Sequence, residues 1–328
     1  MTWTEAKWNY LEFERPIANL EMKIAELANL AETLQSPALL AELEALQARA
    51  DELRRATYKA LTPWQKTLVA RHPDRPHFVD YLAGLIEEFV ELRGDRTYGD
   101  DQTIVGGLGR FRGRPVVVLG LERGHDTATR LKHNFGSARP EGYRKAVRLM
   151  DLAERFGLPV VSFADTAGAY PGAASEERGV AEAVARSIER GLSLSVANVA
   201  VITGEGGSGG ALALAAANRV LMLEHSVYSV ISPEGANSIL WRGTRTPAEA
   251  ASAMKVTAQD LLGLGVVDRV VPEALGGAHS DRETTIRLVG DAIEEELSRL
   301  DGLSGAELRR QRQDRFYAIG RLGTEARS

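Results

Sequence analysis

The feature that most constrains the fold of this chain is a glycine-rich segment, Gly204 to Gly210, between an apolar run and an alanine-rich stretch. The segment reads Gly-Glu-Gly-Gly-Ser-Gly-Gly; the apolar run covers 196–202 and the alanine-rich stretch 211–217. This order predicts a buried strand, a glycine turn and a helix whose first N–H groups lack intrahelical partners. Because glycine has no side chain, a ligand can approach this backbone closely, and the helix dipole favours negative charge there. The segment therefore predicts a site for an anion or for an oxygen that gains negative charge.

Strands and helices alternate through the middle of the chain, which predicts parallel strands joined by helical crossovers and an α/β fold. A β-hairpin is expected first, with strands at 103–111 and 115–121 around Arg112-Gly113. The remaining expected elements are a helix at 140–156, a strand at 159–164, a helix ending near 192, strands at 196–202, 220–223 and 227–231, helices beginning at Thr246-Pro247 and Thr257, and an edge strand within 265–271.

The two ends of the chain have helical periodicity. Apolar residues spaced by three and four predict an antiparallel helical hairpin over about 16–58, with a break at Ser36-Pro37 and Ser36 as a helix cap. A short helix is expected from Thr62-Pro63, then an amphipathic helix from Phe78 to about Arg93-Gly94, and charged helices over 281–321. We divide the chain into a helical region at 1–95, a core at 96–275 and C-terminal helices at 276–328. The hairpin is interpreted as a packing or oligomerisation arm.

Composition excludes several kinds of chemistry. The chain has no cysteine, which removes disulfides, thiolate nucleophiles and cysteine-based metal sites. Its six histidines have no H-E-x-x-H spacing, so no metal site is expected. A net charge of -5 argues against a nucleic-acid partner. Apolar runs are too short to span a bilayer and the N-terminus is not signal-like, so we expect a cytoplasmic protein with no membrane partner.

Three interpretations of the glycine segment compete. One is a G-x-G-x-x-G dinucleotide fingerprint, with Glu224 as the ribose-binding acid. It is disfavoured because that motif normally opens the first strand-helix unit, whereas three strands precede it here. The second is a G-x-S-x-G nucleophile elbow at Ser208, which requires a histidine and an acid from His225, His279 and Asp268. The third uses no side chain: the adjacent amides of Gly206 and Gly207 hold an oxyanion.

Two further loops are expected at the same edge of the sheet. Asp165 to Gly172 follows the strand at 159–164, and Ser232-Pro233-Glu234-Gly235 follows the strand at 227–231. Because ligands of open parallel sheets bind at the carboxyl ends of the strands, these loops and the glycine segment define a cleft. Asp165 and Glu234 can also serve only as turn or first-turn acids. The residues expected to bind substrate are Gly168, Ala169, Tyr170, Ser232, Pro233 and Glu234.

Ala253-Met254-Lys255-Val256 has some likeness to the lysine motif of biotin-carrier domains. That lysine belongs at the tip of a β-hairpin, whereas 247–255 is rich in alanine and glutamate and predicts a helix. Lys255 is therefore interpreted as a solvated side chain.

Several long motifs in order resemble one family, the alpha subunits of bacterial acetyl-CoA carboxylase carboxyltransferase. They are the segments 204–210, 165–172, 140–146, 228–235 and 275–279, together with 11–14, 16–17, Arg71-His72-Pro73 and Arg75-Pro76. The resemblance covers nearly the whole chain. It implies a crotonase-like (ClpP/crotonase) spiral of beta-beta-alpha units with an N-terminal helical hairpin and C-terminal helices, and a carboxyltransferase domain over about 40–300.

The resemblance also implies a function. The family transfers the carboxyl group of carboxybiotin to acetyl-CoA, giving malonyl-CoA for fatty acid biosynthesis, and is active only with a beta subunit in an alpha2-beta2 assembly. The beta subunit carries a four-cysteine zinc ribbon, the biotin sits on a separate biotin carboxyl carrier protein, and a separate biotin carboxylase uses ATP. By resemblance, the amides of Gly206 and Gly207 hold the biotin ureido oxygen, Ser208 is a small spacer, and the beta subunit holds the thioester oxygen. A non-enzymatic scaffold that assembles the complex through its helical arms is the alternative.

The chain departs from the family pattern in two places. Ala167 stands where the family usually has proline, which affects the rigidity of that loop. The segment 123–136 is also less familiar, but it keeps Arg130, Lys132 and His133, which can either meet a phosphate or carboxyl group or form a solvated basic face.

Overall fold

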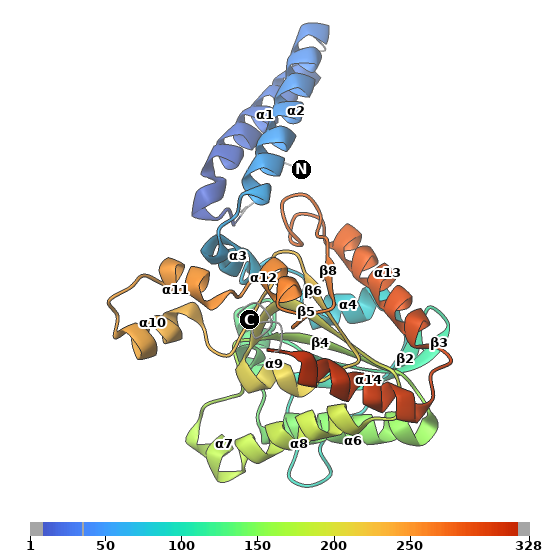
Figure 1. Ribbon diagram of the computed structural model, residues 1–328. Coiled ribbons are helices and arrows are strands. Elements are labelled where there is room, and N and C mark those ends of the chain that lie inside the picture. Colours follow the sequence, from blue (N-terminus) through green and yellow to red (C-terminus); the bar gives the residue numbers. More distant parts are fainter. Residues whose placement is uncertain (1–8, 35, 321–328) are drawn as a thin grey trace, which may run out of the picture.

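In the computed structural model, which describes residues 9–34 and 36–320, helices cover both faces of one sheet and a helical hairpin projects away from it (Figure 1). The helices are α1 (Arg15–Leu34), α2 (Pro37–Lys59), α3 (Pro63–Ala70), α4 (Phe78–Leu85), α5 (Thr127–Lys132), α6 (Pro140–Phe156), α7 (Ala173–Glu177), α8 (Val180–Ser193), α9 (Ser208–Ala215), α10 (Pro233–Trp241), α11 (Pro247–Met254), α12 (Ala258–Gly263), α13 (Arg282–Leu300) and α14 (Gly305–Ala318). Two 3-10 helices lie at Glu12–Glu14 and Asn134–Gly136.

The sheet of the described residues has eight strands in the order β1-β2-β3-β4-β5-β6-β8, and β7 pairs with β5 outside this path. The strands are β1 (Ile86–Glu91), β2 (Ile104–Phe111), β3 (Arg114–Leu121), β4 (Val160–Thr166), β5 (Asn198–Gly207), β6 (Arg219–Leu223), β7 (Val227–Ser229) and β8 (Arg269–Val271). β1, β2 and β3 are antiparallel, and the pairs from β3 to β8 are parallel. The α/β prediction is confirmed.

The strand β5 changes partners along its length. Residues 199–202 pair with β6, and 205–207 pair with β7 instead. β4 lies on the other side of β5 throughout, with Thr166 opposite Gly206. The glycine-rich end of β5 thus extends beyond β6 into a separate pairing, which places it at the carboxyl edge of the sheet.

Two apolar cores hold the helices on the sheet, one on each face. On β3, Val117 and Leu119 alternate with Val116 and Val118 between the two cores, and β4 and β5 alternate in the same way. One core contains residues of α6, α8 and α9, and the other contains residues of α4 and α13. Burial of both faces explains why the strands read as continuous apolar runs.

Most sequence predictions of helix starts are confirmed because they rest on local capping chemistry. Thr62 and Thr246 form capping boxes for α3 and α11, and Thr257 accepts a bond from the Asp260 N–H at the start of α12. Ser36 is the residue before α2, with Pro37 at its first position, but its side chain makes no capping bond. The hairpin turn between β2 and β3 has positive φ at Arg112 (48°) and Gly113 (79°), the geometry that two-residue hairpins favour.

The predicted helix from Phe78 to about Arg93 is wrong beyond Leu85, because β1 begins at Ile86 and pairs with β2. The expected strands at 227–231 and 265–271 are shorter, as β7 and β8 show. Since β1 lies within the segment we took as helical, the division at residue 95 remains a prediction. None of the described helices is long and apolar enough to cross a membrane.

Candidate functional site

Gly206 and Gly207 are the last two residues of β5, and both are buried. A Cβ atom on Gly206 would lie 2.8 Å from the Tyr228 ring, and one on Gly207 would lie 2.3 Å from the backbone carbonyl of Ala167. The glycine segment was predicted as a turn after residue 202, but Gly204 to Gly207 continue the strand. The reason is that β4 and β7 pair with this backbone on either side.

The turn itself is confined to Ser208, which has a φ of 55° and is the exposed first residue of α9. No side chain caps α9, so the first N–H groups of this helix gain no side-chain acceptor. A Cβ atom on Gly168 would lie 3.8 Å from the Ser208 Cβ, so the two glycine loops meet here as expected. The accessible part of the junction is therefore Ser208 and the half-buried Gly209, and Gly206 and Gly207 lie beneath it.

The loop after β4 is fixed at two points. Gly168 N–H donates to the Thr166 hydroxyl at 3.0 Å, and Tyr170 N–H donates to the Ala138 carbonyl at 2.9 Å. The Arg139 guanidinium lies over the Tyr170 ring, 5.1 Å from its centroid. Between these points Ala167 is exposed, whereas Gly168, Ala169 and Tyr170 are half-buried.

Asp165 joins the two central strands through its carboxylate. Its Oδ1 accepts the Glu205 N–H at 3.0 Å and an Arg123 N–H at 2.9 Å. A Cβ atom on Gly204 would lie 2.6 Å from this same Oδ1, so glycine is required there for the close approach. Asp165 is therefore more than a turn acid, because it bridges β4, β5 and the segment after β3.

Arg71, in the segment after α3, joins two parts of the predicted site. Its guanidinium donates to the carboxylate of Glu205 at 2.6 and 3.1 Å and to that of Glu234 at 2.6 and 3.3 Å. Burial would lower the pKa of Arg71, but these hydrogen bonds raise it above its ordinary value. Burial would likewise raise the pKa of Glu234, yet Arg71 lowers it. Both side chains therefore stay charged.

The Ser232-Pro233-Glu234 loop is held in place by its own helix as well as by Arg71. Ser232 accepts the Gly235 N–H at 3.1 Å as the cap of α10, and Pro233 is the buried first residue of that helix. Glu234 lies in the first turn of α10, as the interpretation as a first-turn acid predicted. It is also connected to Glu205 of β5 through Arg71.

Two cavities are lined by residues of this site. A polar one of about 170 Å³ is lined by, among others, Arg71, His77, Arg123, Arg130 and Asp165. An apolar one of about 570 Å³ opens beside Ser208 and Gly209. It is walled by Leu212, Tyr228, Val230, Met254, Leu264 and Phe316, among others. A flat apolar group can therefore lie next to the uncapped start of α9.

Arg130, Lys132 and His133, the residues singled out in the segment 123–136, lie in three different environments. Arg130 lines the polar cavity and donates to the Gly124 carbonyl at 3.3 Å. Lys132 is exposed, as a solvated basic face requires. His133 is buried, with Nδ1 at 2.5 Å from the Gln102 carbonyl, so it belongs to the support of the loop and not to a basic surface.

The nucleophile-elbow interpretation lacks its partners. His225 packs against the Tyr58 ring, His279 stacks on His72, and Asp268 pairs with Arg315. Within the described residues none of these three side chains hydrogen-bonds Ser208. The dinucleotide interpretation also fails, because the strands from β3 to β6 follow one another in chain order and provide no topological switch point. Glu224 lies at a strand end and accepts Lys66 through its backbone carbonyl.

Lys255 is 65% exposed in its side chain and caps the end of α11, as expected for a solvated lysine. Residues 9–34 and 36–320 contain no group of three or more histidine, aspartate or glutamate side chains arranged to hold a metal ion.

Arg71, Arg123 and Glu205 are the site residues that sequence reasoning did not assign. Arg71 and Glu205 are 134 positions apart, so no spacing pattern connects them. The one available signal for Arg71 and Glu205 was their presence inside segments that carry the family resemblance, 71–73 and 204–210. Arg123 lies outside those segments.

Residues 10–320 match the family model described as acetyl co-enzyme A carboxylase carboxyltransferase-like. The chain is 68% identical over 317 residues to the acetyl-coenzyme A carboxylase carboxyl transferase subunit alpha of Phenylobacterium zucineum (strain HLK1), covering 97% of this chain and 99% of that one. It is 67% identical to the subunit of the same name from Caulobacter vibrioides (strain NA1000 / CB15N), with the same coverage.

Solved structures share the fold at low identity. A Pseudomonas malonate decarboxylase hetero-tetramer with coenzyme A matches with a TM-score of 0.54 at 17% identity, over 70% of this chain and 90% of that chain. Transcarboxylase 12S matches with a TM-score of 0.53 at 20% identity, over 67% of this chain and 41% of that chain. These neighbours are crotonase-like, so the predicted fold class is confirmed.

Proposed function

The chain belongs to the family of acetyl-CoA carboxylase carboxyltransferase alpha subunits, and we propose that the junction of β5 and α9 is its carboxyl-transfer site. The chain is a subunit of a carboxyltransferase that moves a carboxyl group from carboxybiotin to acetyl-CoA, giving malonyl-CoA for fatty acid biosynthesis. Biotin, carried on a separate protein, supplies the carboxyl group, so this chain's task is to bind and orient it and to stabilise charge.

A subunit named alpha acts in a complex with a partner subunit. The finer composition belongs to the proposal: a beta subunit bearing a zinc ribbon in an alpha2-beta2 assembly, a biotin carboxyl carrier protein, and a biotin carboxylase that uses ATP. This chain has no cysteine and therefore cannot supply a four-cysteine zinc ribbon. We place the complex in the cytoplasm.

Backbone amides are the proposed catalytic groups. When the carboxyl group leaves, negative charge develops on the ureido oxygen, and fixed N–H donors directed at that oxygen lower the barrier. The resemblance implies this role for Gly206 and Gly207. Because β4 and β7 pair with this strand end on either side, we propose that the N–H groups at the uncapped start of α9, which begins at Ser208, share the role. Because these glycines lie beneath Ala167 and Tyr228, the ligand oxygen must approach from the side of Ser208 and Gly209.

The remaining predicted residues fit binding roles around this point. From the β4 side, Gly168 approaches Ser208 and Ala169 approaches Gly210, with Tyr170 next in the same loop. Ser232, Pro233 and Glu234 form a second loop, tied to Glu205 through Arg71. The apolar cavity beside Ser208 and Gly209 is of a kind that can hold the hydrophobic part of biotin. The observation that carries the proposal is the contact of the two glycine loops, which brings Ala167 against Gly207 and Gly168 against Ser208.

Three alanine substitutions of glycine test the assignment. In Gly207→Ala the new Cβ would lie 2.3 Å from the Ala167 backbone, which cannot move aside as a side chain can, and we expect malonyl-CoA formation to fall about 10²- to 10³-fold. In Gly206→Ala the contact is with the Tyr228 ring at 2.8 Å, which can move, so a smaller loss is expected. Gly263→Ala meets no atom within 4 Å and serves as the control.

Activity is measured with purified beta partner, acetyl-CoA and carboxylated carrier protein, and folding is checked by circular dichroism. Full activity of a folded Gly207→Ala protein would overturn the oxyanion assignment and favour the scaffold alternative. Stoichiometric labelling of Ser208 by a fluorophosphonate would instead restore the nucleophile interpretation.

A further inference from the structure

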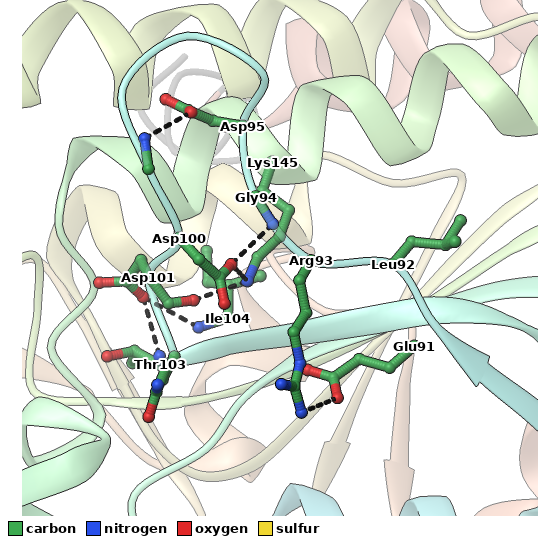
Figure 2. A network of polar contacts seen from close by, with 12 residues as sticks. Glu91, Leu92, Arg93, Gly94, Asp95, Asp100, Asp101, Thr103, Ile104 and Lys145 are labelled. Carbon is green, nitrogen blue, oxygen red and sulfur yellow. Dashed lines mark hydrogen bonds and ion pairs between the residues drawn. The ribbon is translucent and has the colours of Figure 1, made fainter.

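Asp101, between β1 and β2, is a buried carboxylate that the carboxyl-transfer site does not explain. It is 3% exposed, and its Oδ1 accepts the N–H groups of Thr103 at 2.8 Å and Ile104 at 3.1 Å. Figure 2 shows these bonds inside a larger network that includes Asp100 and Lys145. A buried charge normally requires several partners, and this one has them.

Lys145 of α6 fixes the position of Asp101 from the other side. The lysine is 1% exposed, and its Nζ donates to the Asp101 backbone carbonyl at 2.6 Å and to the Asp100 carboxylate at 2.5 Å (Figure 2). The Asp101 carboxylate also lies close to the first turn of α6, because a Cβ atom on Gly142 would lie 2.9 Å from its Oδ1. The Asp100-Asp101 segment is thus clamped against the start of α6.

The second carboxylate oxygen of Asp101 acts on the residue that precedes α6. Asp101 Oδ2 accepts the Arg139 N–H at 2.9 Å. The neighbouring Ala138 carbonyl accepts the Tyr170 N–H at 2.9 Å, and the Arg139 guanidinium covers the Tyr170 ring at 5.1 Å. Asp101 is therefore connected to Tyr170 through a single dipeptide, Ala138-Arg139, which contacts Asp101 on one side and Tyr170 on the other.

We propose that Asp101 is a positioning residue, which fixes the Ala138-Arg139 corner so that the Gly168-Ala169-Tyr170 segment keeps the conformation that binds biotin. The proposal rests on the function assigned above to that segment. Asp101 is linked to this segment through the Arg139 N–H, which its carboxylate accepts, and the neighbouring Ala138 carbonyl, which accepts the Tyr170 N–H.

Asp101→Asn breaks one bond of the carboxylate while keeping its size. The asparagine Oδ1 can still accept Thr103 and Ile104, but its amide group then faces the Arg139 N–H, donor against donor. We expect hydrogen exchange at the Tyr170 amide to be at least tenfold faster than in the wild type. In the assembled complex we expect the KM for carboxylated carrier protein to rise about tenfold, with the KM for acetyl-CoA within twofold.

Glu154→Gln is the matched control. Glu154 lies at the opposite end of the same helix α6, and its carboxylate also accepts a backbone N–H, that of Ser195 at 3.0 Å. In Glu154→Gln the amide oxygen can still accept the Ser195 N–H, but the new amide group faces the Arg190 guanidinium, donor against donor. This weakens the anchoring of α6 without touching the Ala138-Arg139 corner, so exchange at Tyr170 and both KM values should stay at wild-type levels.

The outcomes separate this inference from the function on which it rests. Unchanged exchange at Tyr170 in Asp101→Asn overturns the positioning role, whatever the activity. Faster exchange with an unchanged KM for the carrier overturns the assignment of the Tyr170 segment to biotin binding, and leaves Asp101 a purely structural role. If Asp101→Asn does not fold, Lys145→Met replaces it, because this variant keeps the Asp101 carboxylate but releases the Asp100-Asp101 segment. It must then also give faster exchange at the Tyr170 amide and a higher KM for carboxylated carrier protein.

Discussion

Arg71 and Glu205 form a two-bond ion pair, Nε to Oε2 at 3.1 Å and Nη2 to Oε1 at 2.6 Å, directly before Gly206 and Gly207 of β5. Glu205 is 8% exposed in its side chain, so its charge depends on this partner and on the nearby Arg123. The same guanidinium holds Glu234, so one side chain sets the spacing between β5 and the start of α10.

Arg71→Met should therefore reduce both stability and activity. It leaves the Glu205 carboxylate buried with weaker compensation, and we expect the free energy of unfolding to fall by about 3 kcal/mol. Malonyl-CoA formation should fall at least tenfold, because the Ser232-Pro233-Glu234 loop loses its tether. Urea unfolding and the reconstituted assay measure the two effects.

Arg114→Met is the control for that substitution. Arg114 also makes a two-bond pair, with Asp301 at 2.8 Å twice, but that carboxylate is 57% exposed. We expect a loss below about 1 kcal/mol and unchanged activity. Equal losses for Arg71→Met and Arg114→Met would show that burial of Glu205 is not the deciding factor.

Glu273→Gln should destabilise the fold strongly. The side chains of Arg75 and Glu273 are 1% and 0% exposed, and they join β5, through the Thr203 carbonyl, to the segment after β8. Burial would raise the pKa of Glu273, but the Arg75 guanidinium and backbone N–H groups lower it to about 2. Neutral glutamine leaves the buried Arg75 charge without an ionic partner, so the free energy of unfolding should fall by about 3–5 kcal/mol. Urea unfolding measures this loss.

Adding Arg75→Met to Glu273→Gln should recover part of that loss, because both buried charges are then gone. Strictly additive losses in this double-mutant cycle would contradict a direct coupling between the two side chains.

Acidification should weaken the fold through His279. Burial, with His72 stacked on its ring at 3.7 Å, lowers the pKa of His279 from 6.5 to about 3. Between these values the unfolded chain takes up a proton at this position and the folded chain does not, so the free energy of unfolding falls as pH decreases from about 6.5. At pH 5 this amounts to about 2 kcal/mol.

His279→Asn removes that titration, so its free energy of unfolding should depend less on pH between pH 7 and pH 5 than that of the wild type. Chemical unfolding at several pH values tests this, and identical slopes for the two proteins would exclude His279 as the source.

Ala167→Pro should stabilise the protein by about 0.5–1 kcal/mol. Ala167 is exposed and does not have a positive φ, and it follows an extended strand residue, Thr166, which tolerates a following proline. Thermal unfolding measures the gain. In contrast, Ala60→Pro should be destabilising, because Ala60 N–H donates to the Thr57 carbonyl at the end of α2. A destabilised Ala167→Pro protein would show that this loop needs a freedom that proline removes.

The sequence predicted those parts of the site that depend on local chemistry. Thr62, Thr246 and Thr257 begin helices because each side chain accepts a backbone N–H three residues ahead. The region 86–91 was mispredicted because its apolar spacing continues the helical period of Phe78 and Leu82, and only pairing with β2 makes it a strand. Likewise, Gly204 to Gly207 were taken as a turn, since glycine signals flexibility unless neighbouring strands hold it.

By itself, then, the sequence determined the alternation of strands and helices, the glycine junction and the family, because capping, turn chemistry and motifs act over a few residues. Only the tertiary structure decided that Gly206 and Gly207 are buried, that Arg71 links Glu205 to Glu234, and that the Asp101 carboxylate accepts the Arg139 N–H. Those relationships join residues far apart in the chain, and burial and charge pairing across such separations are set by how the elements pack, which no local spacing encodes.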